Sequence, residues 1–157
     1  MKIEKTNVMR ILDQHKINYN SYAYYCTEAI SGTEVAKILN QNPEQVYKTL
    51  VTVGASKQNY VFVVPVCNEL NLKKAAKAVG EKSIEMIKSK ELLPLTGYIH
   101  GGCSPIGMKK FFTTVIDETA VLWDTIIFSG GKIGYQVELS VEELEKVIKF
   151  TIQDIAD

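Results

Sequence analysis

The 157-residue sequence is poor in the residue types that most often mark a catalytic centre. It contains only two histidines and three cysteines, and it has no CxxC, HExxH, Walker or GxSxG motif. His100 and Cys103 are the only close His/Cys pair, and two candidate ligands are too few for a zinc site. We therefore predict no metal and no cofactor. Cys26, Cys67 and Cys103 are odd in number and far apart, which is typical of reduced thiols in a cytoplasmic protein.

Net charge and long apolar runs are lacking as well. The 18 Lys and Arg residues balance 18 Asp and Glu residues, so a site for a polyanion must be a local patch. The apolar runs are far too short to span a bilayer, and the charged N-terminus lacks the apolar core of a signal peptide. Repeats, low-complexity segments and linkers are also absent. We expect one domain over residues 1–157, in the cytoplasm, with no membrane partner.

The hydrophobic pattern predicts a chain that mixes helices and strands. Helical spacing and capping residues predict helices over residues 6–15 and after Ser31, Asn71 and Ser140. Alternation and β-branched residues predict strands over these ranges: 19–25, 46–53, 58–66, 83–87, 111–116, 121–128 and 135–139. We expect residues 89–93 to form a helical turn that Pro94 stops.

Glycine is concentrated in two stretches. Residues 96–110 read TGYIHGGCSPIGMKK, and residues 129–134 read SGGKIG. Adjacent glycines allow backbone conformations that a Cβ forbids, and Pro105 stiffens the first stretch. A stiff loop with free N–H groups can receive a carbonyl oxygen or a phosphate. A tight connection between strands is the alternative interpretation.

The sequence offers one candidate nucleophile. Cys103 lies three residues after His100, and a thiol–imidazole dyad is conceivable at this spacing. Residues at this spacing on a strand or tight turn tend to face apart, so we do not expect the dyad. No paired-carboxylate arrangement stands out either.

Lys48 lies inside the predicted strand 46–53. Alternation places Val46 and Leu50 on the same face as Lys48, and this indicates either an edge position or a functional site. Other lysines follow Asn71 and the first glycine stretch. They form either solvated faces or a basic patch that contacts a nucleic-acid backbone.

Four motifs occur together and in order: Lys48-Thr49-Leu50, LNLKKAAKAVG (70–80), TGYIHGGCSPIGMKK (96–110) and SGGKIG (129–134). With them the chain resembles the YbaK/EbsC family, the free-standing relatives of the prolyl-tRNA synthetase editing domain. The resemblance covers nearly the whole chain. It implies an α/β fold of the α+β type, in which helices wrap a mixed, partly closed β-sheet or barrel. The site is then expected in a cleft at the strand ends.

The resemblance also implies an activity, the trans-editing deacylation of mischarged tRNA. The implied substrate is Cys-tRNA(Pro), with Cys-tRNA(Cys) as a further candidate. The partners are then the CCA end of aminoacyl-tRNA and, as a candidate protein, prolyl-tRNA synthetase. The family is thought to let the substrate thiol attack its own ester, so Cys103 is expected to be only a loop residue. The alternatives are an Ala-tRNA(Pro) deacylase and a non-catalytic nucleotide- or tRNA-binding module.

The resemblance assigns roles to particular residues. Lys48 corresponds to the central lysine that holds the 3′-terminal nucleotide, and the backbone amides of Gly101 and Gly102 lie where the ester carbonyl should sit. The implied substrate-binding residues are Tyr24, Ile30, Thr49, Tyr98, Ser129, Gly130 and Gly131. The candidate contacts to the tRNA backbone are Lys73, Lys74, Lys77, Lys109, Lys110 and Lys132. Ile133 stands where many relatives carry arginine, and this departure favours the binding-module alternative.

Overall fold

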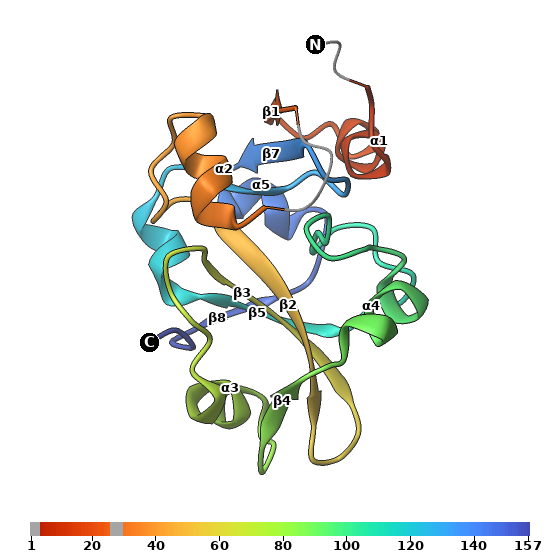
Figure 1. The fold of residues 1–157 in the computed structure, drawn as a ribbon, viewed down its shortest axis with the longest axis vertical. Helices are drawn as coiled ribbons and strands as arrows, with labels where there is room; N and C mark the ends of the chain where they lie inside the picture. Colours follow the sequence, from red (N-terminus) through yellow and green to blue (C-terminus); the bar gives the residue numbers. More distant parts are fainter. Residues whose placement is uncertain (1–3, 26–29) are drawn as a thin grey trace.

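The structure is a computed structural model that describes residues 4–25 and 30–157 (Figure 1). The helices are α1 (Asn7–Gln14), α2 (Gly32–Ile38), α3 (Leu72–Val79), α4 (Ser89–Thr96) and α5 (Val141–Glu145), with a 3₁₀ helix, η1 (Glu118–Leu122). The strands are β1 (Asn20–Ala23), β2 (Tyr47–Gly54), β3 (Asn59–Pro65), β4 (Ile84–Met86), β5 (Thr113–Asp117), β6 (Ile126–Ser129), β7 (Tyr135–Leu139) and β8 (Thr151–Gln153). None of the helices in these ranges has the length and apolarity to cross a membrane.

The strands form two sheets. The larger sheet has the order β4-β2-β3-β5-β8, and the smaller has the order β1-β7-β6. The β2–β3 pair is antiparallel, whereas β5 is parallel to both β3 and β8, so the larger sheet is mixed. A parallel bridge between Val46 and Ile127 joins the start of β2 to β6. The predicted mixed α+β fold is confirmed, and the sheets meet at this bridge without closing into a barrel.

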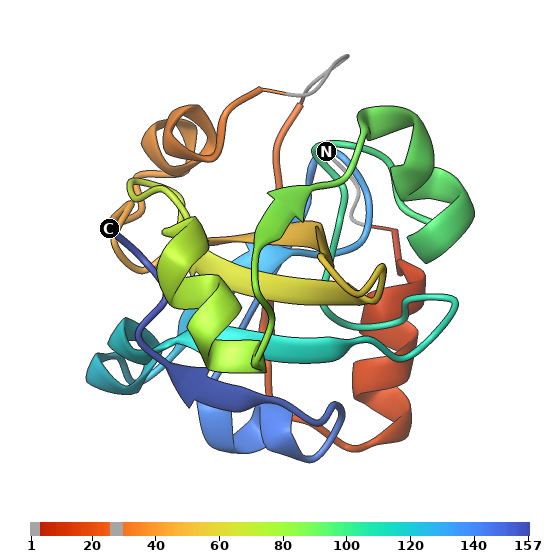
Figure 2. The ribbon, with the colours of Figure 1, turned by 90° about the horizontal axis from the view of Figure 1, so that it is seen from below.

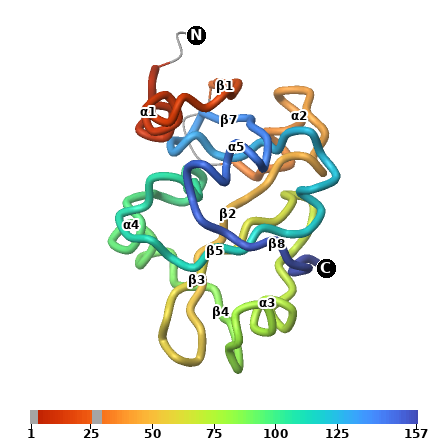
Figure 3. Tube along the Cα trace, turned by 180° about the vertical axis from the view of Figure 1, so that it is seen from behind, coloured from red at the N-terminus to blue at the C-terminus, as the bar shows by residue number. Residues whose placement is uncertain are grey.

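The larger sheet buries both of its faces. Side chains alternate along a strand, so Val61 and Val63 of β3 face one cluster of buried residues while Phe62 and Val64 face another. The first cluster lies between the two sheets and includes residues of α1 and α5. The second includes Ala75 of α3, which lies across the other face of the sheet in Figure 2. Seen from behind, the chain runs from α5 to β8 beside β5 (Figure 3).

The predicted helix starts are confirmed in detail. The side chains of four cap residues each accept a hydrogen bond from a backbone N–H three residues later: Thr6, Ser31, Asn71 and Ser140. At the other end of α3, Gly80 has a φ of 73°, as expected for a glycine that closes a helix.

Two predictions of secondary structure are wrong, and one strand was not predicted. The predicted strand 121–128 begins only at Ile126, because Asp117 accepts hydrogen bonds from the N–H and hydroxyl of Thr119 and so favours a helical turn. Helix α4 continues past Pro94, which removes only the hydrogen bond to the carbonyl of exposed Lys90. Strand β8 was not predicted, since its three residues are too few to show a pattern.

Candidate active site

A cleft of about 510 Å³ opens where β2 begins. It is bounded by the start of α2, the first residues of β2, the turn after β3, the first glycine stretch and the β6–β7 pair. These segments are far apart in the sequence and meet in the upper half of Figure 1. Of the predicted site residues, six line the cleft: Tyr24, Ile30, Lys48, Thr49, Gly101 and Ser129.

Lys48 enters the cleft from β2. Its side chain is 29% exposed, and its Nζ lies 3.7 Å from Oε1 of Glu69 in the turn after β3. The Glu69 side chain is 83% exposed, so water weakens this ion pair. The Lys48 ammonium is therefore a positive charge in a partly enclosed space, with only a loosely held counter-ion.

The two adjacent glycines of the first stretch, Gly101 and Gly102, differ in position. Gly101, with a φ of 88°, lines the cleft. Gly102 is buried, its N–H donates to the carbonyl of Ile99 at 3.0 Å, and a Cβ on it would lie 3.2 Å from the backbone nitrogen of Ile133. The expectation that both amides meet a substrate carbonyl therefore does not fit the position of Gly102, which instead packs the two glycine stretches together.

Ser129 lines the cleft, but the glycines that follow it do not. The N–H of Gly130 donates to the carbonyl of Tyr135 at 2.9 Å, and the N–H of Gly131 donates to Oγ of Ser129 at 3.1 Å. Both amides are therefore used to shape the turn. Because the Ser129 oxygen accepts from Gly131, its hydroxyl hydrogen remains to be donated to a ligand.

Tyr98 lies beneath the glycine stretches and does not line the cleft. Its hydroxyl donates to the carbonyl of Ile106, and burial raises its pKa to about 12. A Cβ on Gly107 would lie 2.8 Å from this hydroxyl, and one on Gly131 would lie 3.3 Å from the ring. The predicted substrate contact of Tyr98 therefore does not fit its position. The hydroxyl and ring of Tyr98 instead pack against the two glycine stretches.

Thr49 presents an unsatisfied polar atom beside the cleft. Its Oγ1 is buried and has no hydrogen-bond partner in the described part of the chain. Buried polar atoms normally have partners, so an orphan at a cleft is a candidate contact for a ligand. Tyr24 and Ile30 border the same space, and Ile30 directly precedes Ser31, the N-cap of α2.

Gln136 is a cleft residue that the sequence analysis missed. It is only 4% exposed, and its Oε1 accepts a hydrogen bond from Nε2 of Gln41 at 2.8 Å. Oε1 of Gln41 is buried and unpartnered in the described ranges. Gln136 pairs with Ser129 across β6 and β7. No sequence signal marks Gln136, because its burial and its contacts with Ser129 and Gln41 exist only in the fold.

Cys103 and His100 both border the cleft, yet they do not make an activated dyad. Burial raises the pKa of the Cys103 thiol to about 12, so the thiol stays protonated near neutral pH. His100 is exposed, and no hydrogen bond joins the two side chains in residues 30–157. The described ranges also hold no group of three His, Cys, Asp or Glu residues that could bind a metal.

The six lysines proposed as tRNA contacts do not form one patch. Lys74 of α3 binds Asp154 and the carbonyl of Ala156, each at 3.0 Å. Figure 1 separates α3 from the loop after α4, on which exposed Lys109 and Lys110 lie. Exposed Lys73 and Lys77 belong with α3, and Lys132 pairs with Glu4 at 3.8 Å beside the second glycine stretch.

Together, the fold and the cleft define an α+β domain whose cleft is lined by Lys48, Gly101 and the hydroxyl residues Thr49 and Ser129. Residues 28–147 match the model of the family described as the aminoacyl-tRNA editing domain. The chain is 47% identical over 142 residues to an Enterococcus faecalis protein named "Putative Cys-tRNA(Pro)/Cys-tRNA(Cys) deacylase EbsC", covering 90% of this chain and 87% of that protein. The chain therefore belongs to the aminoacyl-tRNA editing domain family, and the predicted YbaK/EbsC kinship and deacylase class are confirmed.

Solved structures agree with this fold. The crystal structure of a hypothetical protein superposes with a TM-score of 0.85 at 21% identity, covering 98% of this chain and 100% of the other. A crystal structure described as "a putative trans-editing enzyme for prolyl tRNA synthetase" gives a TM-score of 0.83 at 22% identity, covering 98% and 99%. At these identities the likeness concerns the fold alone.

Proposed function

We propose that the chain removes cysteine from mischarged Cys-tRNA(Pro) in trans, with Cys-tRNA(Cys) as a further substrate. The observation that carries the proposal is the cleft itself, which combines the Lys48 ammonium with hydrogen-bond donors and a thiol that stays protonated. An aminoacyl ester is already activated, so its cleavage needs positioning and stabilisation of the carbonyl oxygen more than a strong enzyme nucleophile. The name of the Enterococcus faecalis relative supports the same substrates.

In this proposal the cleft residues share the work of positioning. Lys48 holds the 3′-terminal nucleotide through its charge. The N–H of Gly101 and the hydroxyl of Ser129 donate to the ester carbonyl, since both residues line the cleft. Thr49 and Gln136 offer hydrogen bonds to the polar groups of the aminoacyl moiety.

The nucleophile in this proposal is the substrate's own thiol. The cysteinyl sulfur loses its proton and attacks the carbonyl carbon of its own ester, forming a C–S bond. The bond between the carbonyl carbon and the ribose oxygen then breaks, and the ribose oxygen takes up a proton. The products are uncharged tRNA and a cyclic thiolactone of cysteine, and no covalent enzyme intermediate forms.

The flank of the cleft suits a polyanion. Residues 87–116 contain four lysines and only one carboxylate, Glu91, and this segment includes the cleft residues His100 and Gly101. A locally positive surface beside the cleft attracts the phosphates that precede the CCA end. Prolyl-tRNA synthetase remains the candidate protein partner of such a trans-acting enzyme, and the cytoplasm is the compartment where both substrates are made.

The experiment compares the deacylation of Cys-tRNA(Pro), Ala-tRNA(Pro) and Pro-tRNA(Pro) by the wild-type protein. We expect cysteine to be released much faster than the other two. Preferential release of alanine would assign the enzyme to Ala-tRNA(Pro). No release of any amino acid from folded protein would favour the binding module that Ile133 suggests.

A further inference from the structure

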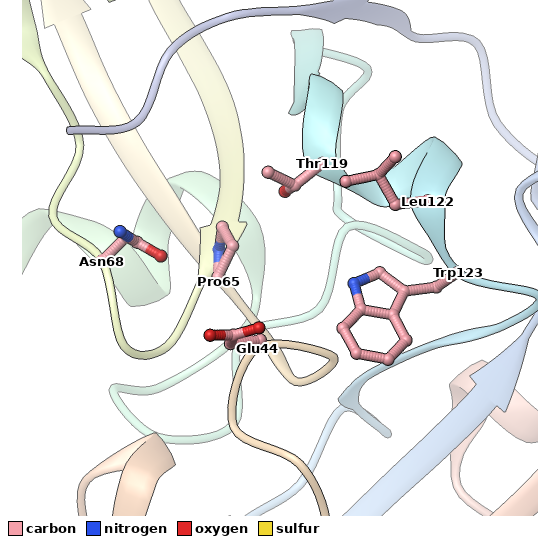
Figure 4. A pocket seen from close by; sticks show the side chains of 6 residues that line it. All are labelled: Glu44, Pro65, Asn68, Thr119, Leu122 and Trp123. Atoms are coloured by element: carbon pink, nitrogen blue, oxygen red, sulfur yellow. The ribbon is translucent and has the colours of Figure 1, made fainter.

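A second cavity lies behind the turn that follows β3. It has a volume of about 460 Å³ and is lined by Glu44, Pro65, Asn68, Thr119, Leu122 and Trp123 (Figure 4). The turn forms a shared wall, because Pro65 and Asn68 line this cavity whereas Val66 and Glu69 line the cleft. The cavity is therefore next to the cleft but separate from it, and nothing in the proposed reaction uses it.

The polar groups of the cavity are unequally available. The Thr119 hydroxyl donates to Asp117 at 2.7 Å and accepts from Tyr47 at 2.8 Å, so it is already satisfied. By contrast, the Glu44 carboxylate has no hydrogen-bond or ion-pair partner among residues 4–25 and 30–157. The indole nitrogen of Trp123 is turned toward the cavity in Figure 4. An anionic carboxylate and an indole N–H donor are thus left for a ligand.

The charge that lines the cavity is negative. Among its six lining residues Glu44 is the only charged one. Glu118 and Asp124 are sequence neighbours of the lining residues Thr119 and Trp123, and both are exposed and take part in no ion pair in the described chain. A phosphate backbone would be repelled here, and a cation would be attracted.

Large apolar side chains stand at the edge of the cavity. Val121 and Leu122 of η1 are 63% and 79% exposed, and Leu122 itself lines the cavity. Neighbouring exposed apolar residues beside a tryptophan are typical of surfaces that bind proteins. The Glu44 carboxylate is in turn suited to an ammonium or guanidinium group, through a charge-assisted hydrogen bond.

We propose that this cavity is a docking site for a protein segment that presents an arginine or lysine beside an apolar side chain. The basic group binds the Glu44 carboxylate, and the apolar side chain covers Val121 and Leu122. The negative Glu44 carboxylate in the cavity is complementary to the positive charge of this partner. Because the cavity and the cleft share the turn 65–69, a partner held here sits directly beside the site where the tRNA end binds.

Trp123 is the only tryptophan of the chain, so its fluorescence reports on this cavity alone. The probe is the peptide acetyl-Leu-Arg-Leu-amide, compared with the same peptide carrying neutral citrulline or glutamate in place of arginine. We expect the arginine peptide to bind about tenfold more tightly than the citrulline peptide, as a charge-assisted hydrogen bond implies. We expect no binding of the glutamate peptide.

A matched pair of variants tests the assignment. Glu44→Gln should remove the preference for arginine, whereas Glu85→Gln, the same change at an exposed position on β4, should retain it. Circular dichroism establishes that both variants are folded. Equal binding of all three peptides, or an arginine preference that survives Glu44→Gln, would overturn the proposal. Binding of free arginine amide as tightly as the peptide would also overturn it, since the site would then serve a small cation.

Discussion

Two neighbouring hollows in the described part of the chain share a wall and differ in charge. The cleft is lined by Lys48, which pairs with exposed Glu69, whereas Glu44 is the only charged residue among those that line the second cavity. The formal net charge of the chain is zero, so the overall composition does not show that opposite charges lie in the two hollows. A neutral protein can thus present one surface to a nucleic acid and another to a basic partner.

The largest expected effect is on deacylation, which we expect to depend on the cleft and not on the second cavity. Lys48→Ala should lower kcat/KM for Cys-tRNA(Pro) by about 100-fold or more, the loss typical when a charge that positions or stabilises the reacting group is removed. Glu44→Gln should leave kcat/KM unchanged, because Glu44 does not line the cleft. Steady-state deacylation assays measure both, with circular dichroism to show that each variant is folded. Equal activity of Lys48→Ala and wild-type protein would contradict the proposed role of the cleft.

The next prediction concerns the glycines that shape the cleft. Gly131 and Gly80 both have positive φ, but a Cβ on Gly131 would lie 2.7 Å from Val8, whereas Gly80 has open space around it. Gly131→Ala should therefore lower the free energy of unfolding by about 3 kcal/mol, and Gly80→Ala by only about 1 kcal/mol. Urea denaturation measures the difference. Equal losses would mean that packing beneath the cleft does not constrain the second glycine stretch.

A smaller effect is expected on the salt dependence of tRNA binding. It should distinguish the lysines that follow the first glycine stretch from those on α3. Replacing Lys109 and Lys110 by glutamine should reduce the slope of log K against log salt for tRNA(Pro) binding, by about 0.7 to 0.9 for each phosphate that these lysines neutralise. The same double replacement of Lys73 and Lys77 should leave the slope unchanged, because α3 lies away from the glycine loop in Figure 1. If the α3 pair changed the slope and the other pair did not, the tRNA would lie on the opposite flank.

The smallest expected effect is at Cys103. Burial raises the pKa of this thiol to about 12, so the thiol is protonated across the working range and gains charge only at strongly alkaline pH. Cys103→Ser should keep kcat/KM within about threefold of wild type, with the same profile between about pH 6 and pH 9. Loss of activity in folded Cys103→Ser protein would restore the thiol as the enzyme's nucleophile.

Local features of the sequence predicted much of the fold. The four helix caps and the alternation of β2 and β3 depend on residues a few positions apart, and the structure confirms them. The strand predicted over 121–128 was wrong because Asp117 turns the chain with its side chain, a contact that the apolar pattern does not reveal.

The residues that line the candidate cleft were predicted in part. The family motifs identified Lys48, Thr49, Gly101 and Ser129, which the fold brings together from three distant segments. The position of Tyr98 beneath the loops could not be read from its motif, because it depends on packing against both glycine stretches. Gln136 and the second cavity were missed for a related reason, since each depends on contacts between segments that are far apart in sequence.

The most direct test compares the deacylation of Cys-tRNA(Pro) with that of S-methylcysteinyl-tRNA(Pro) by the wild-type protein. The two substrates have the same ester and the same terminal nucleotide, and only the free thiol differs. If the cleft positions the ester and the substrate supplies the nucleophile, methylation should abolish enzymatic release of the amino acid. Equal rates for the two substrates would contradict the account and require a nucleophile from the enzyme or from water.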